Sequence, residues 1–180
     1  EVAEFFWYGC PHCYAFDPTI EAWSKKRAGD VDFVRVPSTL GRKEGVMHAK
    51  AFYAAEALNI GEKMHMPLFN AIQTEHLPLT NEAQIQQLFN KVTGVMPDVF
   101  SATFRGFGVD SRVRKAEQLA MSYGITSVPR AVPSRPWSSI ASRRQTMSSD
   151  AARKISSDAW TLKSPLNVSA STNCLPGCAS

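Results

Sequence analysis

The segment FFWYGCPHCY, residues 5–14, places two cysteines three positions apart directly behind an apolar run. The first eight residues are rich in aromatic and β-favouring types, so they predict a strand buried on both faces. Gly9 ends that strand. Pro11 suits the first turn of a helix, because its backbone angle is preset and it has no N–H to leave unpaired. We therefore expect an α/β fold in which Cys10 stands at a helix start.

The position of Cys10 predicts its chemistry. A helix start favours an anion, because its first N–H groups are unpaired and the helix dipole is positive there. We expect Cys10 to be held as a thiolate, with His12 adding stabilisation through its ring N–H or positive charge. Cys13 lies one turn farther on, where it can attack or receive Cys10. Since a stabilised thiolate favours the dithiol over the disulfide, the disulfide form should oxidise other proteins.

A C-x-x-C pair has other interpretations, namely half of a zinc site or incidental thiols. The alternative from a different class is a metal-binding protein that uses Cys10, Cys13 and His12, with or without the tail cysteines. Against it, His12 is confined to the same turn as both cysteines. Cys174 and Cys178 have no strand-to-helix setting around them, so we interpret that pair as incidental.

Composition excludes several classes of protein. The 180 residues are 44% hydrophobic, enough for one cored domain with or without an insertion. The net charge of +4 comes from scattered basic residues without interleaved aromatics, so we expect no nucleic-acid partner. No apolar run approaches the roughly 20 residues of a membrane span. We expect a monomer.

The run EFFWYGCPHCYAF resembles the active-site segment of the DsbA family, bacterial periplasmic thiol-disulfide oxidoreductases with a thioredoxin-like fold. Three further stretches support the resemblance. VDFVRVP resembles the next strand, residues 48–73 resemble the family's inserted all-helical domain, and residues 120–129 resemble the approach to its cis-proline loop. The resemblance covers residues 1–129.

The resemblance implies roles for the CPHC residues. Cys10 would be the exposed nucleophile and Cys13 the buried resolving thiol. Pro11 and His12, the dipeptide between them, would tune the thiolate. Within this fold, the same dipeptide is the only feature of the sequence that separates an oxidase from a reductase or isomerase.

The resemblance also implies roles outside that motif. Val128 and Pro129 would face the disulfide, although the local sequence alone favours a trans peptide there. Glu4 would be a buried acid that assists proton transfer to or from Cys13, with Arg35 as its partner. The alternative for Glu4 is an ordinary edge residue of the first strand.

By resemblance, the chain is an enzyme that donates a disulfide to folding exported proteins. It would need no dissociable cofactor beyond the Cys10–Cys13 disulfide. A membrane quinone-linked oxidase of the DsbB type would reoxidise it. We expect it in the periplasm, after removal of an export signal.

The pattern divides the chain into four parts. We expect a first thioredoxin-like part, a helical insertion, a second thioredoxin-like part that is atypical after residue 129, and a flexible tail: 1–38, 39–115, 116–162 and 163–180. Within the insertion, Asn81 with Gln84 predicts a capping-box helix start, and Pro97 predicts another start. Asp110 or Ser111 is expected to cap the helix that follows.

The three histidines of the insertion, His48, His65 and His76, are expected to be packing or surface residues, because none shares a helix face with a cysteine or carboxylate cluster. Residues 130–150 are dense in Ser, Arg and Pro and lack the pattern of a β-hairpin, so the last two strands of the fold are doubtful. A shifted reading frame is one hypothesis for this change. Residues 152–162 have helical spacing.

Overall fold

The computed structural model describes residues 1–26, 29 and 31–133. These residues fall in one compact unit, 1–135, and the second unit, 136–180, lies outside the described residues. The hypothesis of a shifted frame, the helix predicted at 152–162 and the pair Cys174 and Cys178 therefore also lie outside them. Of the described helices, none combines the length and apolar character needed to cross a bilayer.

A three-stranded mixed sheet forms the centre of this unit, in the order β2-β1-β3. Strand β1 (Val2–Phe6) pairs in parallel with β2 (Phe33–Pro37) and antiparallel with β3 (Arg130–Pro133). The central strand is buried along both faces, as predicted, with Ala3 and Phe5 fully buried and Phe6 1% exposed. Sheet and helices together form a thioredoxin-like fold, as the sequence predicted.

Strand β3 corrects one expectation. The composition after residue 129 made the strands beyond it doubtful, yet Arg130–Pro133 pairs with β1 in regular register. Four residues are enough because β1 is already fixed by β2, and Val132 packs on the small core that β1 shares with α6 (Phe107–Ser122). The second strand of the expected hairpin lies outside the described residues.

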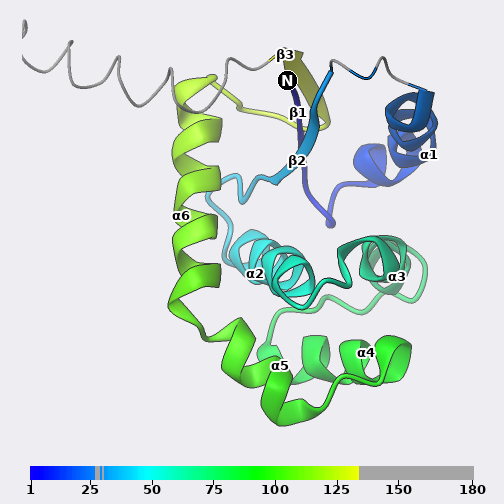
Figure 1. Ribbon diagram of the computed structural model, residues 1–180, viewed down its shortest axis with the longest axis vertical. Coiled ribbons are helices and arrows are strands. Elements are labelled where there is room, and N and C mark those ends of the chain that lie inside the picture. Colours follow the sequence, from blue (N-terminus) through cyan, green and yellow to red (C-terminus); the bar gives the residue numbers. More distant parts are fainter. Residues whose placement is uncertain (27–28, 30, 134–180) are drawn as a thin grey trace, which may run out of the picture. The chain divides into compact units, whose positions relative to one another are not determined.

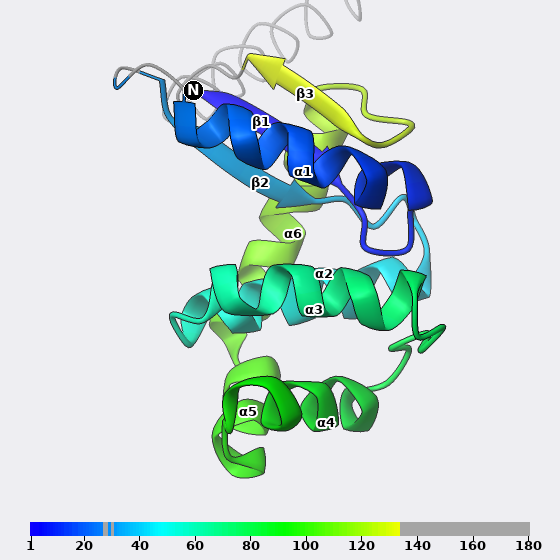
Figure 2. The ribbon, with the colours of Figure 1, turned by 90° about the vertical axis from the view of Figure 1, so that its right-hand side faces the viewer.

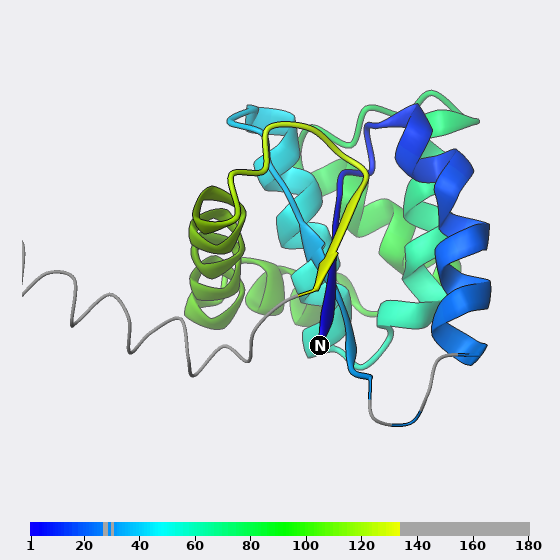
Figure 3. The ribbon, with the colours of Figure 1, turned by 90° about the horizontal axis from the view of Figure 1, so that it is seen from above.

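Two helices cover the sheet from opposite sides. Figures 1 and 3 show α1 (Pro11–Lys26) beside one face and α6 beside the other. Alternation along β1 explains this arrangement, because successive side chains point to opposite faces. Ala3 and Phe5 pack with Ala116 and Ala120 of α6.

Four helices make the all-helical insertion: α2 (Lys43–Ala57), α3 (Gly61–Gln73), α4 (Glu82–Thr93) and α5 (Pro97–Phe104). Figure 2 shows the α2–α3 pair next to the sheet and the α4–α5 pair beyond it. Aromatic rings join the insertion to β1. The Tyr8 ring lies 4.7 Å from Phe69 of α3, and the Phe6 ring lies 5.5 Å from Phe52 of α2.

Two predicted helix starts are confirmed and one is wrong. The Asn81 side chain accepts the Gln84 N–H at 3.0 Å at the start of α4, and Pro97 opens α5. However, α6 begins at Phe107 with Gly106 as its N-cap, so Asp110 and Ser111 lie inside the helix. The Gly106 carbonyl accepts the N–H of Asp110 at 3.3 Å, which starts the helix one turn early. The expected boundary between residues 115 and 116 falls inside α6.

Gly45 marks a close approach between α2 and the loop that follows β2. A Cβ at Gly45 would lie 2.7 Å from the Thr39 Cα and closer still to its carbonyl oxygen. We predict that Gly45→Ala lowers the free energy of unfolding by about 1–3 kcal/mol, the usual cost of overpacking. Urea unfolding of the full chain measures this.

Gly108 provides the matched control, because it lies in the first turn of α6 and a Cβ there would meet nothing within 4 Å. Gly108→Ala should raise stability by about 0.5–1 kcal/mol through lost freedom of the unfolded chain. Equal effects of the two substitutions would contradict the close approach at Gly45.

Candidate functional site

Cys10 occupies the turn between β1 and α1. Its N–H donates to the Trp7 carbonyl at 3.0 Å, and its own carbonyl accepts the Tyr14 N–H at 3.2 Å. The second bond is the first of the helix, so Cys10 is the N-cap residue and Pro11 is the first helical residue. The predicted position of Cys10 at a helix start is confirmed.

The turn depends on Gly9. A Cβ there would lie 2.6 Å from Cε2 of the Trp7 indole and closer still to its Cζ2, so the indole covers the glycine. The indole is held in place from α2, since its Nε1–H donates to His48 Nδ1 at 2.9 Å. His48 in turn contacts the Pro78 carbonyl through Nε2 at 3.0 Å, and burial lowers its pKa, so it stays neutral.

Helix α3 holds the same turn from the other side. Gln73 Nε2 donates to the Tyr8 carbonyl at 2.7 Å, and the Tyr14 hydroxyl donates to Asn70 Oδ1 at 2.8 Å. Both contacts lie within five residues of Cys10 along the chain. The helical insertion therefore positions the cysteines through Tyr8 and Tyr14, which flank them in the chain.

The two cysteines differ in burial. Cys13 is 1% exposed and Cys10 is 9% exposed, and both are free thiols. Cys10 is thus much less open than the expected exposed nucleophile, because Trp7 and Val128 pack against the same cluster. Pro11 and His12 are exposed. Within the described residues, no hydrogen bond joins the His12 ring to either cysteine.

A segment far along the chain completes the site. The Cys10 thiol donates to the Val128 carbonyl at 3.5 Å, and the Val128–Pro129 peptide bond is cis. The structure therefore brings together the predicted residues Cys10, Cys13 and Val128, and it contains the cis bond that local sequence alone did not favour.

Cys13 is a thiol that holds its proton. Burial raises the pKa of Cys13 well above its usual range, and the neighbouring Cys10 and Glu4 raise it further. A backbone hydrogen bond with Trp7 acts in the opposite direction. Any reaction that makes or uses a Cys13 thiolate therefore needs a nearby proton donor or acceptor.

Glu4 is a buried carboxyl group whose charge acts on Cys13. It is 2% exposed on β1, and its Oε2 lies 3.3 Å from Arg35 Nε on β2, which confirms the predicted pair. Burial raises the pKa of Glu4 from 4.5 to about 7; Arg35 opposes the shift, while Asp17 and Glu21 add to it. Near neutral pH, Glu4 can therefore either give or take a proton.

Sequence reasoning missed the rest of this arrangement, which we call the buried charge cluster: Glu4, Asp17, Arg35, His65 and, at its open edge, Glu21, whose side chain is 37% exposed. Arg35 Nη2 lies 3.4 Å from Asp17 Oδ1 and donates to Glu21 Oε2 at 2.7 Å. His65 Nε2 lies 2.8 Å from Asp17 Oδ1. His65 is a buried packing residue, as expected, but its contact with Asp17 was not predicted, because α1 and α3 meet only in the folded chain.

One clue to the cluster was present in the sequence. Asp17 lies four residues after Cys13, so both side chains point to the same face of α1, and that face is buried. A buried carboxylate needs partners, and Arg35 and His65 supply them.

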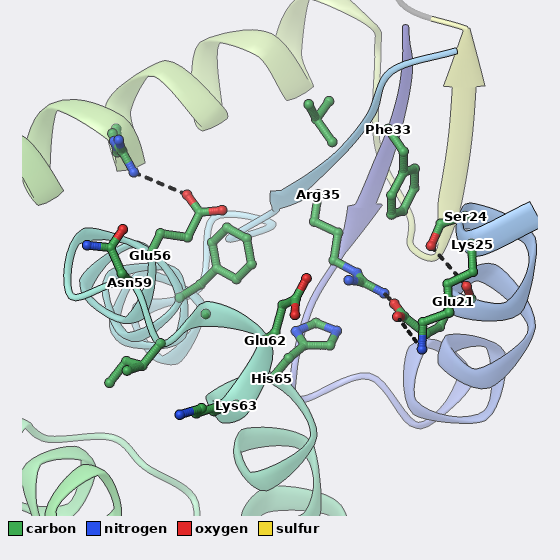
Figure 4. A pocket seen from close by; sticks show the side chains of 15 residues that line it. Glu21, Ser24, Lys25, Phe33, Arg35, Glu56, Asn59, Glu62, Lys63 and His65 are labelled. Atoms are coloured by element: carbon green, nitrogen blue, oxygen red, sulfur yellow. Dashed lines mark hydrogen bonds and ion pairs between the residues drawn. The ribbon is translucent and has the colours of Figure 1, made fainter. Parts of the chain in front are cut away.

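A cleft of about 850 Å³ opens beside the buried charge cluster. Figure 4 shows Arg35 and Glu21 directed toward each other at one wall, with His65 and Glu62 from α3 nearby. Three members of the cluster, Glu21, Arg35 and His65, line the cleft. The described residues contain no group of three or more His, Cys, Asp or Glu side chains that could hold a metal ion.

Comparison with known proteins agrees with this geometry. Residues 43–135, more than half of the chain, match the DSBA-like thioredoxin domain. The chain belongs to the DsbA-like thioredoxin family.

Two named relatives show how far the similarity extends. The "Thiol:disulfide interchange protein DsbA" of Burkholderia cepacia is 44% identical over 133 residues, 73% of this chain and 61% of the relative. The protein of the same name from Pseudomonas aeruginosa is 41% identical over 129 residues, 72% of this chain and 60% of the relative. The chain thus spans about 60% of the length of these DsbA relatives.

Solved DsbA structures have the same fold. The crystal structure of Pseudomonas aeruginosa DsbA matches with a TM-score of 0.68 at 39% identity, over 73% of this chain and 67% of that one. A complex structure of Proteus mirabilis DsbA, with a non-covalently bound peptide PWATCDS, matches with a TM-score of 0.66 at 25% identity, over 73% and 71% of the two chains.

The raised pKa of Glu4 predicts a pH-dependent stability. Between pH 4.5 and about 7 the folded chain keeps a proton on Glu4 that the unfolded chain loses, so stability falls as pH rises through this window. The loss is about 3 kcal/mol at most. We predict that Glu4→Gln removes most of this slope and leaves the part due to Glu56, whose pKa is also raised by burial. Urea unfolding at a series of pH values measures the slope.

Glu62 serves as the control, because it is an exposed carboxyl group on α3. Glu62→Gln should keep the slope between pH 4.5 and 7. A slope in Glu4→Gln as large as that of the unaltered chain would show that another buried group binds the proton.

Proposed function

We propose that this chain is a thiol-disulfide oxidoreductase that donates the Cys10–Cys13 disulfide to exported proteins as they fold. The observation that carries the proposal is the placement of the two sulfurs. Cys10 is the N-cap of α1 with its Sγ 3.5 Å from the carbonyl of Val128, and Cys13 is buried one turn deeper. The names of the DsbA relatives support the same reaction.

The reaction balances with the two sulfurs alone. A substrate thiolate attacks Cys10 Sγ of the disulfide, and the Cys10–Cys13 bond breaks. Cys13 leaves with the electron pair and takes a proton. A second thiolate of the substrate then attacks the substrate sulfur that is bound to Cys10. The Cys10 sulfur leaves as a thiolate. The substrate loses two electrons and two protons, and no dissociable cofactor takes part.

The site residues have distinct roles in this proposal. The helix start stabilises the Cys10 thiolate and makes it a good leaving group, with Pro11 preset for the first turn. Glu4 donates the proton to Cys13 and takes it back during reoxidation. The exposed His12 lies between the two cysteines in the first turn of α1, where it tunes the Cys10 thiolate.

Substrate is proposed to bind beside Val128 and Pro129. The Val128 backbone carbonyl lies beside Cys10, and an extended substrate chain can pair with the backbone there. The peptide bound to Proteus mirabilis DsbA supports a peptide substrate.

We further propose a periplasmic location and reoxidation by a membrane quinone-linked oxidase of the DsbB type. Reoxidation reverses the chemistry: the Cys10 thiolate attacks the partner's disulfide and expels one partner thiolate. Cys13, deprotonated by Glu4, then attacks Cys10 Sγ of the mixed disulfide, and the second partner sulfur leaves as a thiolate. A reductase or isomerase of the same fold is the second candidate. The equilibrium of the cysteine pair with glutathione separates the two, since an oxidase pair stays reduced in more oxidising mixtures.

Substitution of each cysteine tests the proposal. Cys10→Ser should lower the oxidation rate of a peptide with two cysteines by several orders of magnitude, because the nucleophile is lost. Cys13→Ser, mixed with an excess of the same peptide in its disulfide form, should accumulate a mixed disulfide: the Cys10 thiolate attacks the peptide disulfide, one peptide sulfur leaves as a thiolate, and no Cys13 remains to displace the other. Mass spectrometry of quenched reactions measures both.

Cys174→Ser is the matched control, because it removes a cysteine outside the CPHC motif. The rate should stay within about twofold of the unaltered chain. Full activity of Cys10→Ser would refute the proposed role of the pair. Bound zinc or copper that blocks alkylation of Cys10 and Cys13 would favour the metal-binding alternative.

A further inference from the structure

The buried charge cluster contains a histidine to which the proposed reaction gives no role. His65 lies on α3 with 8% of its side chain exposed, and both ring nitrogens are engaged. Nε2 lies 2.8 Å from Asp17 Oδ1, and Nδ1 lies 2.9 Å from the Tyr8 hydroxyl. Three elements that are distant in sequence therefore meet at one imidazole.

The partners of His65 determine which nitrogen carries the proton. Burial raises the pKa of Tyr8 well above its usual range, so the hydroxyl keeps its hydrogen and donates it to Nδ1. Nε2 then carries the ring hydrogen and donates it to the Asp17 carboxylate. This single arrangement satisfies the polar atoms of all three side chains.

Asp17 connects His65 to the redox site. The same oxygen that accepts from His65 lies 3.4 Å from Arg35 Nη2, and Arg35 Nε lies 3.3 Å from Glu4. One guanidinium is thus shared among three carboxylates: Glu4, Asp17 and Glu21. How closely the Arg35 guanidinium approaches Glu4 depends on how strongly Asp17 and Glu21 attract it.

We propose that His65 is a positioning residue of the redox site: by donating to Asp17, it leaves Arg35 free to stay on Glu4. Without that donor, Asp17 must draw its stabilisation from Arg35 alone. Arg35 then shifts toward α1 and away from Glu4 on β1. The Glu4 carboxylate loses part of its counter-charge and holds its proton to higher pH.

The surroundings of His65 support a local effect. Apolar rings enclose it, with Phe6 at 5.3 Å, Phe69 at 5.2 Å and Phe52 at 6.4 Å between ring centres. The titratable and charged groups that face it or share its cleft come from every packed element: Tyr8, Asp17, Glu21, Lys25, Arg35, Glu56, Glu62, Lys63 and Arg112. Of these, Asp17 and Tyr8 alone form hydrogen bonds with it in the described residues.

The inference rests on the proposed function, but its test observes the carboxyl group itself. We would titrate the Glu4 side-chain carbon by ¹³C NMR in the full chain with Cys10 and Cys13 oxidised, so that no thiol of the pair titrates. His65→Phe keeps a ring and removes the donor. In this variant, the midpoint of the Glu4 titration should rise by about 0.5–1 pH unit, because the charge-assisted hydrogen bond from Arg35 to Glu4 weakens.

Two variants make the test specific. His65→Gln keeps an N–H that can reach Asp17, so it should bring the midpoint back toward that of the unaltered chain. Tyr8→Phe changes only the group that orients the ring, so it should raise the midpoint by a smaller amount, and it replaces the test if His65→Phe does not fold. An unchanged or lowered midpoint in the variant that folds overturns the proposal.

His48→Gln is the matched control. His48 is also buried on the insertion with both ring nitrogens engaged, but its partners are Trp7 and the Pro78 carbonyl. It should lower stability and leave the Glu4 midpoint in place. A failure of the proposed function would instead appear as absent peptide oxidation by the unaltered chain, which leaves this titration interpretable.

Discussion

The structure depends on one sharp turn that separates two sulfur atoms of the same helix turn into different surroundings. Cys10 caps α1 beside the Val128 carbonyl, whereas Cys13 lies one turn deeper in the same core, where burial raises its pKa. Contacts from other side chains hold this turn in place. Trp7 covers Gly9 from one side, and Gln73 of α3 binds the Tyr8 carbonyl from the other.

The sequence predicted those parts of the fold that depend on local chemistry. Pro11 and Pro97 open helices, and Asn81 caps one, because each effect needs only neighbouring residues. The start of α6 was misplaced because Asp110 is a good cap by type but Gly106, one turn earlier, already accepts the first helical bond. Composition also misled about β3, whose pairing depends on β1 and not on its own pattern.

The candidate site was predictable to the same extent. The CPHC motif was singled out by its spacing and its setting, and Glu4 by the family resemblance alone. The Asp17–His65 contact was not, because it joins residues 48 positions apart on different helices. Burying several carboxylates around one guanidinium is costly unless each has a partner, so this arrangement trades stability for a group that titrates near neutrality.

Sheet order has a consequence for biosynthesis. The central strand β1 precedes every other described element, and its second neighbour, β3, comes at residues 130–133. The carbonyl that receives the Cys10 thiol lies 118 residues downstream of it. A ribosome therefore releases both thiols long before the backbone that surrounds Cys10 in the folded chain can assemble. Folding helpers that shield this early segment would act on an intermediate that topology makes unavoidable.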